Sequence, residues 1–338
     1  MTKRLSKSYD VPELRSRLRS AFAFGIESAH TDSAHRYRRS DTNTLAWSVT
    51  TKLGFVDKPW LSAWKVKRAV EYIKDNLQRV LAGDEGVFAE AGGAGDRFRD
   101  RAAGIGTTAH DAYDAYLQSW IDSPNSSRGV SAVAVLEEGC RKAGVEPKSE
   151  EVAACRSFDL FLQEHEIIPI ASEIRVWYQK GKDSFAGTVD ALFIHLTVRK
   201  GREGQKGIVD IEGSEHKVHD YTPQESGVWW CAACRREVEP KLVLGDHKTS
   251  TSIITHDDYA LQGTAYAVAI EEEVGIAFDE IWVMRYSKVR AEYELCKVKD
   301  RKQAWNEFIT ISRACDAKES REKGNLLVPL IEREVYKI

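Results

Sequence analysis

The sequence lacks the features of a membrane protein or a protein of an oxidising compartment. Its 338 residues contain no run of about eighteen apolar residues, and no apolar stretch follows Met1 as in a secretory signal. These absences predict a cytoplasmic protein with no membrane partner. The chain has only 6 cysteines, and those outside the C-x-x-C pair are expected to be buried free thiols, typical of a reducing compartment. They are Cys140, Cys155, Cys296 and Cys315.

Net charge is also small. A formal charge of -3, from 49 basic and 52 acidic residues, argues against binding nucleic acid through bulk charge alone. The charges are unevenly spread, however, and residues 1–40 are basic. This segment is either an ordinary solvated face or an arm that contacts phosphates. Its cations are Lys3, Arg4, Lys7, Arg15, Arg17, Arg19, Arg36, Arg38 and Arg39.

Hydrophobic spacing predicts an α/β protein that is mainly helical before residue 165, with a flexible break at 91–95. We expect an N-terminal helical region (1–100), a core (101–320) that contains an insertion (201–239), and a tail (321–338). The expected helices are 59–81, 108–121, 130–143, 149–165, 257–273 and 300–318. The expected strands are 168–178, 185–199, 241–248, 279–287 and 291–299.

Two of these strands carry an acid. Asp190 lies within an apolar run, and Asp246 follows the apolar start of its strand. An unpaired buried carboxylate costs several kcal/mol as a rough figure, so a cation or hydrogen-bond donors usually lie beside it. Because side chains alternate along a strand, Asp246 and Lys248 project on one face and His247 on the other. Either these residues form a metal site suited to phosphodiester hydrolysis, or D-x-K marks a solvated strand end.

The helix expected after Asp246 carries Gln262 and Tyr266, four residues apart and therefore on one face. In one interpretation this polar pair faces the strand ends and binds a phosphate or base. In the other, the tyrosine packs against the core and the glutamine is exposed to water.

The order G-x-x-D at 187–190, D-x-K at 246–248 and Q-x-x-x-Y at 262–266 resembles the PD-(D/E)XK nuclease superfamily, in particular its RecB-like branch. The resemblance implies a restriction-endonuclease-like core, with a mixed central sheet flanked by helices, and Mg²⁺ or Mn²⁺ as cofactor. It implies metal-binding roles for Asp190 and Asp246, with the backbone carbonyl of His247 as a further ligand. Lys248 would orient or help deprotonate the attacking water, and Gln262 and Tyr266 would position DNA.

Two more residues follow from the same resemblance. RecB-like nucleases have a metal-binding histidine at the start of a helix after a Gly-Thr segment, and His110 follows such a segment at 104–108. They often place a catalytic glutamate in the strand before the one that carries the first acid, where Glu173 stands here. The alternatives are a structural hydrogen bond for His110 and an exposed strand face for Glu173.

The insertion is not explained by this resemblance. It contains an H-x-x-H pair and a C-x-x-C pair, whose spacing predicts a structural zinc site in a zinc-ribbon-like insertion. The four ligands would be His216, His219, Cys231 and Cys234. Nucleases of the CRISPR-adaptation type, which share the catalytic motifs, hold an iron-sulfur cluster with four cysteines. No such cluster is expected here, because only two cysteines follow the Q-x-x-x-Y helix.

The function expected from the sequence is therefore a DNA exonuclease acting on linear ends or single strands. It would serve recombination, repair or phage DNA metabolism, with a single-strand annealing protein or a helicase as partner. An endonuclease or spacer-processing nuclease uses the same chemistry. A non-cleaving DNA-end or protein-binding module is the alternative of another class.

Overall fold

The computed structural model describes residues 9–31, 34–123, 131–198, 221–224, 227–231, 236–252 and 257–323. At its centre is a mixed sheet in the order β10-β9-β8-β5-β4, with only the β8–β9 pair parallel. Helix α9 (Asp258–Val274) connects β8 to β9, as a parallel pair requires. The strands are β4 (Ile167–Lys180), β5 (Asp183–Val198), β8 (Arg236–Ser250), β9 (Glu280–Ser287) and β10 (Tyr293–Lys297).

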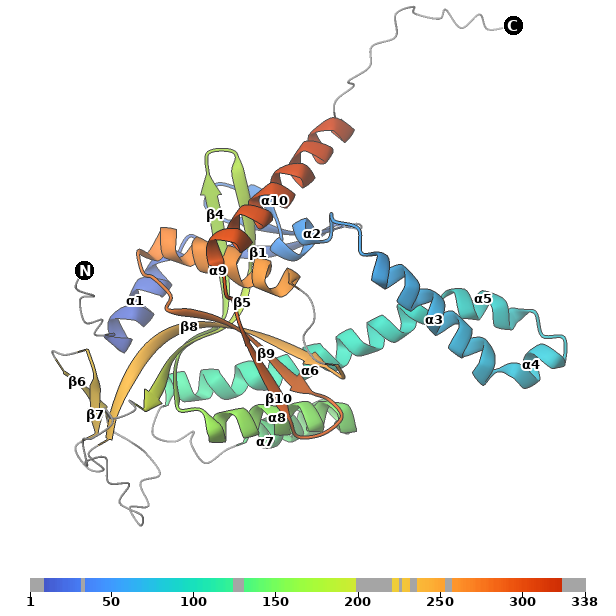
Figure 1. The fold of residues 1–338 in the computed structure, drawn as a ribbon, viewed down its shortest axis with the longest axis horizontal. Coiled ribbons are helices and arrows are strands. Elements are labelled where there is room, and N and C mark those ends of the chain that lie inside the picture. Colours follow the sequence, from blue (N-terminus) through green and yellow to red (C-terminus); the bar gives the residue numbers. More distant parts are fainter. Residues whose placement is uncertain are drawn as a thin grey trace, which may run out of the picture.

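Helices cover both faces of this sheet (Figure 1). Leu242 and Leu244 of β8 pack in a core with α9 and α10 (Arg301–Lys323). Val243, between them, packs in a second core against the opposite helices, as expected from the alternation of side chains along a strand. These helices are α6 (Ala94–Asp122), α7 (Ala132–Ala143) and α8 (Ser149–Glu164). The expectation of an α/β protein with a mixed sheet flanked by helices is confirmed.

The N-terminal region is less helical than expected. It contains a three-stranded antiparallel sheet of β1 (Ile26–Thr31), β2 (Ala34–Arg39) and β3 (Thr44–Trp47). The sequence did not indicate these strands because β2 alternates arginines with His35 and Tyr37 rather than with aliphatic residues. Tyr37 nevertheless packs in a small core with Trp177 of β4 and Ala186 of β5. The small sheet therefore lies against the end of the β4–β5 hairpin.

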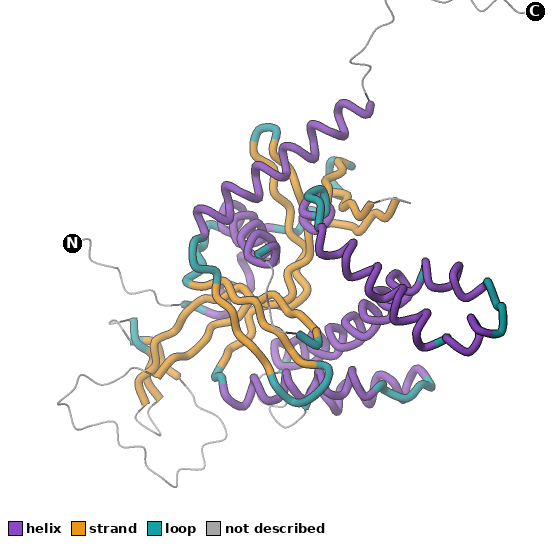
Figure 2. Tube along the Cα trace, turned by 45° about the vertical axis from the view of Figure 1, so that its right-hand side comes forward, coloured by secondary structure: helices purple, strands orange, loops and turns teal. Residues whose placement is uncertain are grey.

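The remaining N-terminal elements are helical, and α3, α4 and α5 project with the start of α6 away from the central sheet (Figure 2). The expected helix 59–81 is divided at Asn76 into α3 and α4. The break expected at 91–95 is a single residue, Gly93, which separates α5 from α6. The bounds are α1 (Val11–Ala21), α2 (Val49–Leu53), α3 (Pro59–Asp75), α4 (Leu77–Leu81) and α5 (Gly86–Gly92).

Part of the expected insertion extends the central sheet. β7 (Trp229–Cys231) pairs with β6 (Tyr221–Pro223) on one side and with β8 on the other. Cys231 is buried in β7, whereas His216, His219 and Cys234 lie outside the described residues. The zinc site therefore stays a prediction. Across the described ranges, none of the helices has the length and apolar character needed to cross a membrane.

Candidate metal centre

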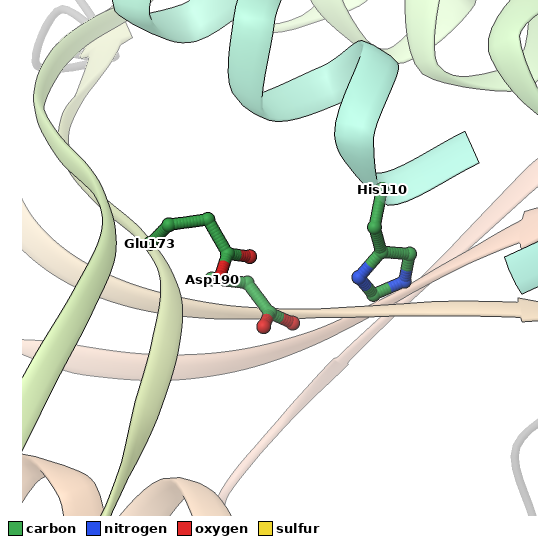
Figure 3. A group of neighbouring side chains, drawn as sticks. All are labelled: His110, Glu173 and Asp190. Atoms are coloured by element: carbon green, nitrogen blue, oxygen red, sulfur yellow. The ribbon is translucent and has the colours of Figure 1, made fainter. Parts of the chain in front are cut away.

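Three side chains predicted from the sequence converge on one point. His110 comes from α6, Glu173 from β4 and Asp190 from β5 (Figure 3). One ligand atom of each, a ring nitrogen or a carboxylate oxygen, lies within 4.8 Å of the other two. Such a set of nitrogen and oxygen donors suits a divalent metal ion. The antiparallel pairing of β4 and β5 places Glu173 beside Asp190.

Glu173 has an unusual backbone conformation. Its φ is 49°, in the left-handed region that non-glycine residues adopt at a cost of about 1–3 kcal/mol. Ser172 pairs with Ala191 and Ile174 with Val189, so Glu173 lies opposite Asp190. Desolvation raises the pKa of the Glu173 carboxyl to about 7, and the negative charges of Asp190, Asp114 and Asp111 add to this. Although the Glu173 side chain reaches solvent, its carboxyl group therefore lies in a field that favours a cation.

Asp190 is oriented by the neighbouring strand. The backbone N–H of His247 donates to its Oδ2 atom at 2.6 Å. Burial raises the pKa of Asp190, although the Lys248 charge and this hydrogen bond act in the opposite direction. Ser172 supports the same region by donating to the carboxylate of Asp114. The Asp190 carboxylate is thus held by a backbone N–H rather than by a flexible side chain.

Asp246 and Lys248 form an ion pair on one face of β8. Lys248 Nζ lies 2.7 Å from Asp246 Oδ2, and Asp246 is almost fully buried. Burial raises the pKa of Asp246 to about 6. The positive charge of Lys248 lowers this pKa, and the negative charge of Asp190 raises it. Burial opposes the charged form of Lys248, but Asp246 and Asp190 outweigh it and raise the Lys248 pKa. Lys248 is therefore a fixed positive charge at neutral pH and a poor proton acceptor.

The position of His110 in its helix differs from the expectation. It lies in the middle of α6, a 29-residue helix that begins at Ala94, rather than near a helix start. Gly104 and Gly106 disfavour a helix in isolation, but α6 packs against α3 and the sheet along its length. Burial lowers the pKa of His110 to about 4, with the Lys248 charge as the next cause. The imidazole is neutral at neutral pH, the form that binds a metal ion.

His247 projects away from Asp246 and Lys248, as the alternation predicts. Its ring is buried among the aromatic rings of Tyr113, Phe158 and Tyr286, at centroid distances of 5.5, 5.7 and 5.5 Å. The side chain therefore belongs to the core beneath the site. The role of its backbone carbonyl as a metal ligand stays a prediction.

The glutamine-tyrosine pair of α9 shares one face, and Gln262 Nε2 donates to Tyr266 Oη at 3.4 Å. The Tyr266 ring is buried and covers Gly187, where an added Cβ would lie 2.3 Å from Tyr266 Cε1. The glycine of G-x-x-D therefore provides the space for the tyrosine of Q-x-x-x-Y. This burial supports a packing role for Tyr266 rather than direct contact with DNA.

Three residues at the site escaped the sequence interpretation. Asp114 follows His110 by four residues on α6 and adds negative charge near Glu173, a spacing that could have indicated it. The ring of Tyr259 lies 5.0 Å from Lys248 Nζ, one turn before Gln262. Tyr37 of the small sheet shares a hydrogen bond of 3.0 Å with the Thr188 hydroxyl, which no local pattern could reveal.

No protein-family model matches this chain, and no curated protein matches it significantly in sequence. The geometry of the site therefore carries the functional argument.

Proposed function

We propose that this protein is a metal-dependent DNA exonuclease with a PD-(D/E)XK nuclease core. One observation carries the proposal. The His110, Glu173 and Asp190 cluster lies beside the Asp246–Lys248 ion pair on the central sheet. Carboxylates that bind a hard cation, next to a fixed positive charge, are the groups that phosphodiester hydrolysis requires.

The donor set fits Mg²⁺ or Mn²⁺. Glu173 and Asp190 supply carboxylate oxygens and His110 a neutral imidazole nitrogen, and Asp246 adds a further buried carboxylate beside Asp190. Carboxylates suit both ions, and an imidazole is more often a ligand of transition metals. When bound, the ion would polarise the phosphate and lower the pKa of a coordinated water.

The remaining residues act on charge and orientation. Lys248, held by Asp246 at 2.7 Å, would stabilise the negative charge that develops on the phosphate. The Tyr259 ring lies 5.0 Å from this ammonium group, within the range of a cation–π interaction. The backbone N–H of His247 holds the Asp190 carboxylate in place. Each of these groups is set by a strand or helix rather than by a loop, which gives the precision that catalysis needs.

A non-cleaving binding module is less well supported. Burial raises the pKa of Asp246 and the charge of Asp190 adds to this effect, so keeping both acids ionised costs free energy. A binding module gains nothing from buried acids beside a lysine. The RecB-like motif order favours action at DNA ends over internal cleavage.

The test is degradation of end-labelled linear DNA and closed-circular DNA with Mg²⁺ or Mn²⁺. The variants are Asp190→Asn and Lys248→Met, with Asp100→Asn as the matched control because Asp100 is an exposed acid of α6. We expect wild type and the control to shorten linear DNA, circles to survive, and the two site variants to be inactive. Cleavage of circles would indicate an endonuclease, and equal behaviour of wild type and site variants would refute a nuclease function at this site.

A further inference from the structure

A cavity of about 520 Å³ lies between α1, the C-terminal part of α6 and β4. This volume is in the range of small-molecule sites, about 300–1,000 Å³. Glu173 lines the cavity and also belongs to the metal cluster. The cavity therefore adjoins the candidate metal centre.

Three arginines line this cavity: Arg15, Arg19 and Arg175. Arg15 is held in place because its guanidinium donates to the carbonyl oxygens of Ile121 at 3.2 Å and Pro169 at 2.7 Å. Burial lowers the pKa of Arg15, the positive charge of Arg19 lowers it further, and the negative charge of Asp122 raises it. The two cations therefore repel each other, Asp122 offsets only part of this effect at Arg15, and an anion bound near Arg19 would reduce the repulsion further.

Two of the arginines are available to a ligand. Within the part of the chain that the structure describes, neither Arg19 nor Arg175 forms an ion pair. Arg175 donates from one nitrogen to the carbonyl oxygen of Ile26 at 2.9 Å, which leaves its other N–H groups. The acids of the lining are Glu173 and Asp122. The Asp122 carboxylate accepts a hydrogen bond of 3.0 Å from Gln118.

The lining also contains the polar side chains of Gln118 and Ser172 and a group of apolar side chains. The larger apolar side chains are an aromatic ring and aliphatic groups, among them Leu18, Phe22, Ile26, Ile170 and Ile174. The apolar side chains suit the face of a base, and a guanidinium without an ion-pair partner can bind a phosphate with two parallel hydrogen bonds. The lining therefore contains groups that suit the base and the phosphate of a nucleotide.

We propose that this cavity binds a nucleoside monophosphate, with its phosphate at Arg19 and Arg175. The inference rests on the proposed nuclease function and deepens it. A nucleotide seated here lies directly beside Glu173, so the bond that joins it to the rest of a strand reaches the metal centre. Hydrolysis adds water across that bond and divides the strand into a mononucleotide and a shortened chain. The nucleotide is either the terminal residue of the DNA or the released product.

The first experiment measures binding of dAMP to the full chain by calorimetry, without metal, and compares it with deoxyadenosine and inorganic phosphate. The variants are Arg19→Gln and Arg175→Gln, with Arg156→Gln as the control because Arg156 is exposed on α8 and outside the cavity. We expect dAMP to bind wild type and the control equally, and each cavity variant at least tenfold more weakly. Absence of dAMP binding, or equal binding by all four proteins, would overturn the proposal.

The second experiment distinguishes the two sources of the nucleotide. Linear DNA with and without terminal phosphates is degraded by wild type and by the cavity variants. If the cavity holds the terminal residue, wild type prefers one phosphorylated end and the variants lose that preference. If it holds the product, dAMP inhibits wild type and the variants resist inhibition. Arginine-dependent binding of dAMP without any DNA degradation would refute the nuclease function and support the cavity assignment. DNA degradation without arginine-dependent binding of dAMP would support the nuclease function and refute the cavity assignment.

Discussion

Substitution of Gly187 by alanine tests the packing between the G-x-x-D and Q-x-x-x-Y motifs. The added methyl group would lie 2.3 Å from Tyr266 Cε1 and 2.8 Å from both Cζ and Oη. Tyr266 is nearly fully buried on α9, so its ring has no open space to enter. Either the ring or strand β5 must shift, and β5 carries Asp190 three residues later.

Overpacking of this kind costs about 1–3 kcal/mol, and we expect the upper part of that range because the obstacle is a buried ring. Gly106→Ala is the control, because an added Cβ there meets nothing within 4 Å. In the interior of helix α6 this control should gain about 0.5–1 kcal/mol. The two glycine substitutions should therefore change stability in opposite directions.

The assay is urea unfolding of both variants, and of Gly187→Ala combined with Tyr266→Ala. Loss of the ring removes the obstacle, so Gly187→Ala should lower the free energy of unfolding only slightly when Tyr266→Ala is also present. The coupling energy between the two substitutions should be about 0.5–3 kcal/mol. Gly187→Ala should also weaken Mn²⁺ binding, because it displaces the strand that carries Asp190. A neutral effect of Gly187→Ala, or the same cost with and without the ring, would refute the reasoning.

Two further predictions concern stability away from the site. Lys52 is fully buried and pairs with Asp316 at 2.7 Å, so Asp316→Asn removes the ion-pair partner of a buried charge and should cost about 3 kcal/mol in urea unfolding. Glu272→Gln, which breaks an exposed pair with Lys180, should cost less. Burial lowers the pKa of His195 to about 4, so between about pH 6.5 and 4 the unfolded chain binds a proton that the folded chain does not, and stability falls as pH falls. His195→Gln should reduce this loss by about 1–2 kcal/mol between pH 7 and pH 5, after allowance for partial exposure, and an unchanged pH profile would contradict the assignment.

The central strands and the site residues they carry could be predicted from the sequence. Apolar runs around Asp190 and before Asp246 identified β5 and β8, and the alternation of side chains correctly paired Asp246 with Lys248 and turned His247 to the other face. Spacing of four residues placed Gln262 and Tyr266 on one face of α9. The spacing of side chains along a strand or helix is a local property of the sequence, and these features depend on that spacing alone.

Features that depend on contacts between distant segments could not be predicted. Strand β2 is charged, and its place in a sheet is set by packing of Tyr37 on Trp177 and Ala186. Helix α6 begins at Ala94 and continues through Gly104 and Gly106 despite their low helix propensity. The arginine-lined cavity joins residues of α1, α6 and β4 that no short motif links.

Titration of Mn²⁺ into the full chain shows whether His110, Glu173 and Asp190 form a metal centre. Free and bound Mn²⁺ are separated by electron paramagnetic resonance for wild type, Asp190→Asn and the control Asp100→Asn. Wild type and the control should bind Mn²⁺ equally, and Asp190→Asn should bind it at least tenfold more weakly. Equal binding by all three proteins, or no binding by wild type, would contradict a metal centre at these residues.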